Sequence, residues 1–184
     1  MARNASARRV CLIGFMGAGK TSVGRALGRR LGWPFHDLDE VIENRQGKSV
    51  AALFAEDGEP AFRRAESSAL EDLLTGKNAG GNLVVALGGG GFVQPYNRSV
   101  LAKSGVITVL LEAPIDELRR RCVRDGRKRP LAGDEAQFAR LFAERHTTYG
   151  LARVRVDTMN KPVEQIAGEI EHMIAATAEA EAKE

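Results

Sequence analysis

The residue types and spacing near the start of the chain indicate a phosphate-binding loop. Residues 14–21 read Gly-Phe-Met-Gly-Ala-Gly-Lys-Thr and fit the pattern Gly-x-x-x-x-Gly-Lys-Ser/Thr. An apolar run precedes them and a helical pattern follows, so the loop joins a buried strand to a helix N-terminus, where backbone N–H groups favour an anion. A glycine-rich turn that fits by chance is the alternative. The residues expected to bind a polyphosphate are Gly17, Ala18, Gly19, Lys20, Thr21 and Ser22.

Two side chains at the end of this loop have distinct expected roles. Lys20 would reach the β- and γ-phosphates, where its charge assists transfer, and the Thr21 hydroxyl would bind Mg²⁺. Such loops usually work with an aspartate after a further strand, but the predicted strand at 83–87 ends in glycines. The carboxylate must therefore come from elsewhere in the chain.

Asp37 and Asp39 are the candidates, because they follow a short apolar segment. In an extended chain, side chains two residues apart point to the same side. One carboxylate would hold a metal-bound water, and the other would hydrogen-bond or deprotonate an acceptor hydroxyl. Alternatively, Asp39 is the N-cap of a helix that begins at Glu40.

Two further segments have both a ligand-binding and a structural interpretation. Four consecutive glycines at 88–91 favour close approach of the backbone to a ligand, although a strand-to-helix turn would also use them. Arg63 and Glu66 lie one turn apart on a predicted helix, so the glutamate could hold the guanidinium in a fixed pose. A surface salt bridge that needs no ligand is the commoner arrangement of such a pair.

The elements that must position these residues alternate between strands and helices. Apolar runs predict strands at 9–14, 34–36, 83–87, 106–111 and 153–156, and helical spacing fills the intervals between them. This alternation predicts a doubly wound α/β domain with a parallel sheet. Residues 37–75 contain helical patterns without a strand, which indicates an insertion beside the sheet.

An arginine-rich segment at 120–135 interrupts the alternation and also contains turn-forming residues. We interpret it as a mobile lid, because arginines complement phosphates and glycines absorb hinge motion. A solvated basic loop and a nucleic-acid surface are the alternatives.

Composition limits the remaining classes. With 184 residues and 43% hydrophobic content, the chain suits one domain with its own core, and its net charge of +3 is modest. Cys11 and Cys122 are far apart and are expected to be reduced. No stretch is long enough to span a membrane or to form a signal-peptide core, so we expect a cytoplasmic protein with flexible ends at 1–8 and 175–184.

Together these segments resemble the shikimate kinases, P-loop enzymes of the nucleoside-monophosphate-kinase-like group. The resemblance runs from about residue 9 to residue 174. Its residues are Gly14-x-x-Gly17-x-Gly19-Lys20-Thr21-x-x-Gly24-Arg25, Asp37-x-Asp39, Gly58-Glu59-x-x-Phe62-Arg63-x-x-Glu66, Gly88-Gly89-Gly90, Arg129-Pro130-Leu131, Arg145, Thr148-Tyr149, Asp157-Thr158 and Pro162.

The resemblance implies one three-layer P-loop kinase domain over 9–174, with a central five-stranded parallel sheet, a helical substrate-binding insertion and a mobile lid. It implies transfer of the ATP γ-phosphate to the 3-hydroxyl of shikimate, with Mg²⁺, in aromatic amino acid biosynthesis. We expect a monomer with small-molecule substrates and neither nucleic acid nor membrane as a partner.

The resemblance also implies roles for single residues. Asp39 would contact the shikimate hydroxyls and act as base, and Arg63 and Arg145 would bind its carboxylate. Gly89 and Gly90 would bring backbone amides to the substrate.

At the nucleotide, Asp37 would hold Mg²⁺ through water beside Thr21. Arg129 would move in with the lid and bind ATP, neutralising charge on the transferring phosphoryl group, so that the catalytic set is Lys20, Asp39 and Arg129. The loop after Asp157 would pack against adenine.

Three other functions stay open on the sequence. A kinase for another hydroxylated acid such as gluconate would also use two arginines. A GTP-dependent switch is disfavoured because the segment at 160–163, Asn-Lys-Pro-Val, lacks the final aspartate of a guanine-binding Asn-Lys-x-Asp element. A nucleic-acid module is disfavoured because no aromatic residue occurs within 120–135.

Overall fold

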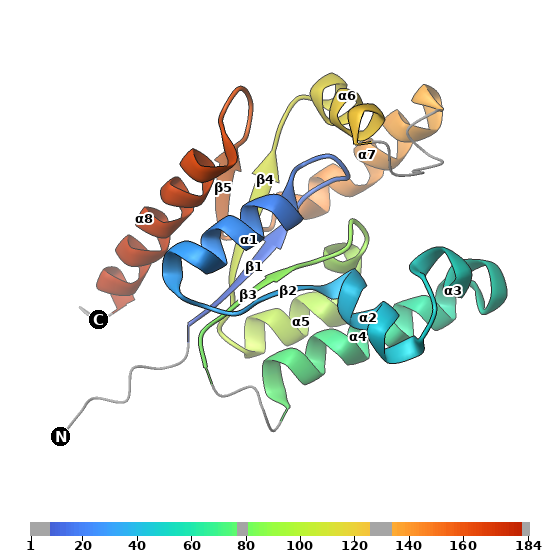
Figure 1. The fold of residues 1–184 in the computed structure, drawn as a ribbon, viewed down its shortest axis with the longest axis horizontal. Coiled ribbons are helices and arrows are strands. Elements are labelled where there is room, and N and C mark those ends of the chain that lie inside the picture. The colour runs from blue at the N-terminus through green and yellow to red at the C-terminus, as the bar shows by residue number, and fades with distance from the viewer. Residues whose placement is uncertain (1–7, 77–80, 126–133, 182–184) are drawn as a thin grey trace.

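A five-stranded parallel sheet forms the centre of the computed structural model, which describes residues 8–76, 81–125 and 134–181 (Figure 1). The spatial order of the strands is β2-β3-β1-β4-β5, and every neighbouring pair is parallel. The five predicted strands are confirmed to within a residue at each end. Their bounds are β1 Arg9–Ile13, β2 Phe35–Asp37, β3 Leu83–Ala86, β4 Ile107–Glu112 and β5 Val154–Asp157.

The inner strands read as continuous apolar runs because helices cover both faces of the sheet. Every residue of β3 is buried, as is each residue of β1 after Arg9. The helices are α1 Lys20–Leu31, α2 Leu38–Gln46, α3 Val50–Glu56, α4 Gly58–Thr75, α5 Pro95–Lys103, α6 Ile115–Arg124, α7 Glu135–Tyr149 and α8 Val163–Glu181, with a short 3₁₀ turn, η1, at Gly91–Val93.

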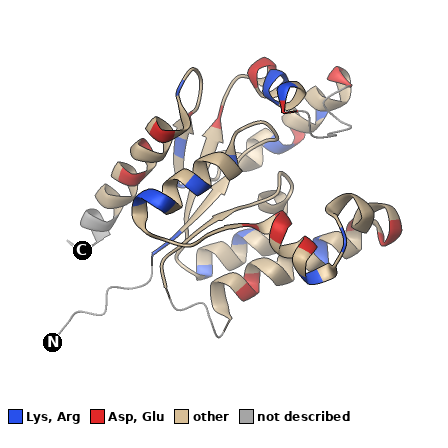
Figure 2. Cartoon of the chain, viewed as in Figure 1, with Lys and Arg blue, Asp and Glu red and all other residues tan. Residues whose placement is uncertain are grey.

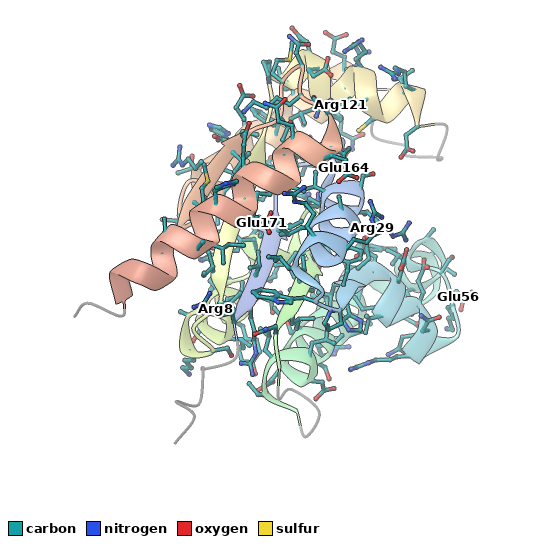
Figure 3. All side chains as sticks on the ribbon, turned by 60° about the vertical axis from the view of Figure 1, so that its left-hand side comes forward. Arg8, Arg29, Glu56, Arg121, Glu164 and Glu171 are labelled. Atoms are coloured by element: carbon teal, nitrogen blue, oxygen red, sulfur yellow. The ribbon has the colours of Figure 1, made fainter. Side chains whose placement is uncertain are left out.

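Helices α1 and α8 lie side by side over one face of the sheet (Figure 1). Figure 2 shows basic residues on α1 and acidic residues along α8. Arg29 donates to Glu164 at 3.1 Å and Arg30 to Glu171 at 2.7 Å, on the side of α8 that Figure 3 brings forward. Because these pairs are solvent-exposed, they contribute little to stability, and the apolar contact beneath them holds α8 in place.

Glycines set both ends of α1, the helix that follows the phosphate-binding loop. Gly19 precedes the helix with φ +89° and Gly32 ends it with φ +65°, both in the left-handed region that favours glycine. The helix therefore begins at Lys20, and its first free N–H groups face the loop.

The predicted insertion is confirmed, because α2, α3 and α4 follow one another between β2 and β3. The predicted lid was too long. Residues 120–124 belong to α6, whose buried Leu118 and Cys122 keep helical spacing, and α7 begins at Glu135. Arg129 lies outside the described residues.

At the C-terminal end, α8 continues to Glu181, beyond residue 174, where the sequence predicted the domain to end. Over the described ranges, no helix combines the length and apolarity needed to cross a membrane.

Phe35 fills the space beside two helical glycines of α1. A Cβ on Gly24 would lie 2.7 Å from Cδ2 of the Phe35 ring, and one on Gly28 would lie 3.2 Å from Phe35 Cβ. The ring is thus a packing group between β2 and α1.

The glycine at position 24 should therefore tolerate no larger residue. Gly24→Ala should lower the free energy of unfolding by about 1–2 kcal/mol, because overpacking exceeds the gain in helix propensity. Gly168→Ala in α8 is the matched control, since its nearest contact would be an ordinary 3.6 Å, and it should raise stability by about 0.5–1 kcal/mol. Urea unfolding measures both, and equal effects would contradict the packing argument.

Candidate active site

The predicted phosphate-binding residues line one side of a cavity of about 540 Å³. Residues 17–22 all contribute to its wall, and α6 and the segment after β5 form the opposite side. That segment includes Thr158, Asn160 and Lys161, so the loop predicted to pack against adenine lies at the same cavity as the phosphate-binding loop.

Close packing explains the glycine at position 17. Gly17 has φ +83°, and a Cβ there would lie 2.9 Å from Cys122 Sγ and against the carbonyl of Leu118. The loop is therefore seated directly on α6. Within the loop, Lys20 Nζ donates to the carbonyls of Gly14 at 2.8 Å and Phe15 at 3.1 Å, and these bonds orient the lysine side chain.

Asp37 connects the phosphate-binding helix to α2. Thr21 Oγ1 donates to Asp37 Oδ2 at 2.6 Å, and the backbone N–H of Asp39 donates to Asp37 Oδ1 at 3.1 Å. Asp37 is thus the N-cap of α2, and the suggestion that Asp39 caps this helix is wrong. Asp39 belongs to the first helical turn, so the predicted extended i, i+2 arrangement is also wrong.

The Asp39 carboxyl lies in a largely buried environment. Burial, and then the nearby Asp37 carboxylate, raise its pKa from 3.8 to about 6, although Lys20 and Arg63 act in the opposite direction. Asp39 Oδ1 is buried and has no hydrogen-bond partner among the described residues. A buried acceptor without a partner marks a place for a ligand donor.

The glycine run at 88–91 gathers the acceptor residues around one turn, which leads into η1. Each glycine faces a different polar side chain, so a Cβ at any of the four would crowd the site. Measured from a Cβ placed on each glycine, the facing atoms are Asp39 Oδ1 at 2.7 Å for Gly88, Arg145 Nη1 at 3.1 Å for Gly89, Arg63 Nη1 at 2.6 Å for Gly90 and Glu66 Oε1 at 2.9 Å for Gly91.

Arg63 and Glu66 form a buried pair rather than a surface salt bridge, so the surface interpretation is wrong. Arg63 Nη1 donates to Glu66 Oε2 at 2.9 Å, and Glu66 is 0% exposed. Arg63 Nη2 also donates to Glu59 Oε1 at 3.0 Å. Burial raises the pKa of Glu66 while Arg63 opposes the rise, and Glu66 Oε1 is a second buried acceptor without a partner among the described residues.

Helix α7 brings two further groups to this turn. Arg145 lies beside Gly89. Tyr149, one turn later, donates its hydroxyl to the carbonyl of Gly89. The sequence analysis noted Tyr149 only as part of the resemblance, although its i, i+4 spacing from Arg145 placed both on one face of a helix.

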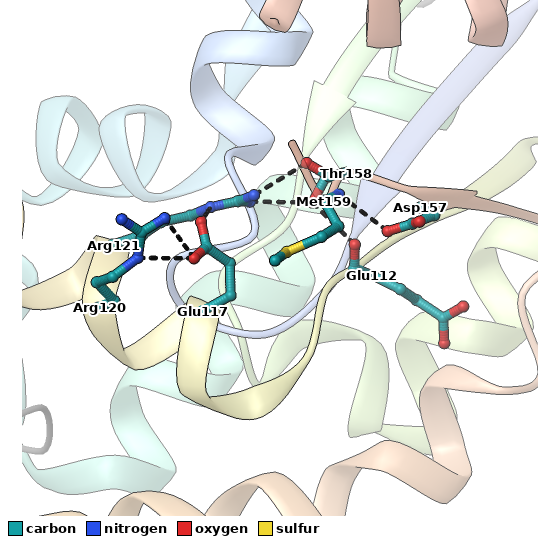
Figure 4. Close-up of polar contacts among 7 residues, drawn as sticks. All are labelled: Glu112, Glu117, Arg120, Arg121, Asp157, Thr158 and Met159. Atoms are coloured by element: carbon teal, nitrogen blue, oxygen red, sulfur yellow. Dashed lines mark hydrogen bonds and ion pairs between the residues drawn. The ribbon is translucent and has the colours of Figure 1, made fainter. Parts of the chain in front are cut away.

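A second network at the far end of the cavity was missed from the sequence. Arg121 Nε donates to Glu117 at 2.7 Å, and its two other nitrogens donate to the hydroxyl and carbonyl of Thr158, each at 2.9 Å (Figure 4). Arg120 shares Glu117, whose pKa is lowered by the hydrogen bonds from Arg121 and then Arg120. Thr158 Oγ1 also donates to the carbonyl of Glu112 at 2.8 Å. The network joins α6 to the loop after β5.

The predicted site residues fall into two adjoining groups. One binds anions around Lys20 and Thr21, and the other presents carboxylates and guanidinium groups around the glycine turn. Asp37 connects the two groups. The arrangement suits transfer of a phosphoryl group to a small hydroxylated anion, because positioning and charge neutralisation dominate such reactions.

Comparison with known proteins gives one consistent family. A family model described as shikimate kinase matches residues 16–175. A shikimate kinase of Geobacter metallireducens is 42% identical over 168 residues, covering 90% of each chain. A solved shikimate kinase of Acinetobacter baumannii in complex with shikimate is 32% identical, with a TM-score of 0.83 and coverage of 93% of this chain and 94% of that one. A gluconokinase of Sinorhizobium meliloti shares the fold alone, with 22% identity, a TM-score of 0.62 and 97% coverage of each chain.

The raised pKa of Asp39 predicts that this carboxylate destabilises the folded protein when ionised. Its folded pKa of about 6 exceeds the ordinary 3.8, so the stability that protonation provides is complete below pH 4 and is lost as the pH rises through 6. Asp39→Asn should therefore raise the free energy of unfolding at pH 8 by about 2 kcal/mol, and the gain should disappear near pH 4. Urea unfolding at both pH values measures this.

The control for that experiment is Asp72→Asn, because Asp72 is an exposed partner of Arg45. Its effect at pH 8 should stay within about 0.5 kcal/mol. An Asp39→Asn protein no more stable than the parent at pH 8 would contradict the stated cause of the shift.

Proposed function

Because this chain belongs to the shikimate kinase family and transfers the γ-phosphate of ATP to the 3-hydroxyl of shikimate, we propose an assignment of its side chains to the two substrates. ATP occupies the cavity between the phosphate-binding loop, α6 and the loop after β5. Shikimate lies against the glycine turn at 88–91, between Arg63 and Arg145.

The observation that carries the acceptor assignment is the pair of buried carboxylate oxygens without partners. Asp39 Oδ1 and Glu66 Oε1 lie beside Gly88, within the reach of the arginines that face Gly89 and Gly90. Shikimate offers hydroxyl donors for the oxygens and a carboxylate for the guanidinium groups, so its polar groups complement the turn. Glu66 fixes Arg63, which limits the entropy lost when the carboxylate binds.

At the donor side, Lys20 and the loop amides bind the phosphates. Lys20 Nζ is held by two carbonyls of its own loop, so it requires little reorganisation to meet the β- and γ-phosphates. Asp39 above pH 6 is ionised, accepts a hydrogen bond from the 3-hydroxyl and takes its proton as the phosphoryl group transfers.

Thr21 and Asp37 fit the Mg²⁺ that kinases of this kind use. Their oxygens are 2.6 Å apart, and hydroxyl and carboxylate oxygens are the donors that this hard cation takes, usually with several waters retained. Thr21 would hold the ion directly and Asp37 through water. When bound, Mg²⁺ would neutralise charge on the phosphates.

The remaining assignments stay predictions. Arg129 as the residue that neutralises the transferring group lies outside the described residues. We propose that one chain acts as a monomer in the cytoplasm, without nucleic acid or membrane as a partner. Light scattering at assay concentration tests the monomer.

The activity should be selective for shikimate. Purified protein with ATP and Mg²⁺ should release ADP on addition of shikimate, should do so at least about tenfold more slowly with gluconate, and should lose turnover by at least about 100-fold in Lys20→Ala. A coupled ADP assay measures all three. Robust turnover of gluconate without turnover of shikimate would overturn the acceptor assignment.

Arg63 should contribute to binding of the acid more than to the chemical step. Arg63→Ala should raise the KM for shikimate by about 10–100-fold, corresponding to the loss of a charge-assisted pair, with a smaller change in kcat. Arg64→Ala is the matched control, because Arg64 is the next residue of α4 and is exposed, and its KM should stay within about twofold. An unchanged KM for shikimate in Arg63→Ala would count against the proposed binding of the shikimate carboxylate by Arg63.

A further inference from the structure

We propose that Tyr149 is a positioning residue of the acceptor site, whose hydroxyl holds the Arg145 guanidinium and the Gly89 carbonyl in a fixed relation. Tyr149 acts through these two groups and does not touch the reacting atoms. The inference rests on the shikimate site proposed above.

The contacts of the Tyr149 hydroxyl carry the proposal. Tyr149 is the last residue of α7 and is only 2% exposed. Its hydroxyl donates to the carbonyl of Gly89, sixty positions away in the sequence, and the Arg145 guanidinium lies beside the same glycine. Two side chains of α7 therefore meet the glycine turn at Gly89.

The chemistry of the three groups fixes the direction of each hydrogen bond. A guanidinium group can only donate and a carbonyl oxygen can only accept, whereas a hydroxyl does both. The Tyr149 hydroxyl gives its one proton to the Gly89 carbonyl, and its lone pairs are available to accept from the Arg145 guanidinium beside it. Phenylalanine would preserve the ring packing but would offer neither the proton nor the lone pairs.

The geometry around Gly89 shows why the hydrogen bond from Tyr149 matters for the substrate. A Cβ on Gly89 would lie 3.1 Å from Arg145 Nη1 and 3.9 Å from the Tyr149 oxygen, so the three groups converge. Gly88 and Gly90, on either side, face Asp39 and Arg63. A shift of Gly89 would therefore displace the groups that meet both ends of the acid.

The protonation state of Tyr149 agrees with this role. Burial raises its pKa to about 12, although Arg145 and Arg63 favour the ionised form and Glu66 acts with burial. The hydroxyl therefore keeps the proton that it donates to Gly89 at neutral pH.

The first test is Tyr149→Phe. It should raise the KM for shikimate by about tenfold, while kcat and the KM for ATP change by less than about twofold, because the lost contacts hold the acid equally in the ground and transition states. Tyr96→Phe is the matched control, since Tyr96 is the chain's other tyrosine and hydrogen-bonds Glu71 on the surface, and it should change none of these constants. An unchanged KM for shikimate in folded Tyr149→Phe would overturn the proposal.

A double-mutant cycle separates positioning from a general effect on folding. If Tyr149 acts through Arg145, Tyr149→Phe should add less than about twofold to the KM of Arg145→Ala. Effects that multiply independently would overturn the inference. A normal KM in Arg145→Ala itself would instead overturn the proposed carboxylate site, so the two failures are distinguishable.

A spectroscopic test needs no loss of the hydroxyl. In Tyr96→Phe protein labelled with 3-fluorotyrosine, Tyr149 is the one labelled position. Its ¹⁹F resonance should shift saturably when shikimate is added without nucleotide, and the shift should be lost in Arg145→Ala. No shift at saturating shikimate would overturn the proposal even if Tyr149→Phe failed to fold.

Discussion

The carboxylate of Asp37 is the interaction on which the organisation of the site depends. One of its oxygens accepts from the Thr21 hydroxyl and the other from the backbone of Asp39. The first bond belongs to the helix that follows the phosphate-binding loop, and the second begins the helix that carries the acceptor carboxylate. A single side chain therefore connects the phosphate-binding helix to the helix that carries Asp39, and such positioning of the two halves of a site is what a phosphoryl transfer requires.

The parallel sheet supplies the frame for this arrangement. Strands β2, β3 and β1 are neighbours, and their carboxyl ends lead respectively into Asp37, the glycine turn and the phosphate-binding loop. Parallel strands place these three ends at one edge of the sheet, where ligands bind in α/β proteins. Apolar burial in the strands thus gives rigid support to a polar site, in which Glu66 and Asp39 retain buried oxygens without partners among the described residues.

The features that could be predicted from the sequence are those with a local sequence pattern. The strands and the phosphate-binding loop follow from apolar runs and glycine spacing, which depend on neighbouring residues alone. The burial of Glu66 could not be inferred, because the glycine turn that covers it is more than twenty residues away in the chain. The sequence offered Asp39 as the alternative cap of α2, and the structure gives that place to Asp37, because the backbone N–H of Asp39 donates to the Asp37 carboxylate. The Arg121 network was also missed from the sequence. The density of arginines at 120–135 suggested a loop, whereas the helical spacing of the apolar Leu118 and Cys122 shows that Arg121 belongs to a helix.

Helix α6 borders the cavity and contacts two of the loops that line it. The phosphate-binding loop packs against Leu118 and Cys122, and Arg121 of the same helix hydrogen-bonds Thr158 in the loop after β5. Because Arg121 lies between the other two residues in the sequence, both contacts fall within about one helical turn. A displacement of α6 would therefore carry both loops with it, and the walls of the cavity would shift in concert.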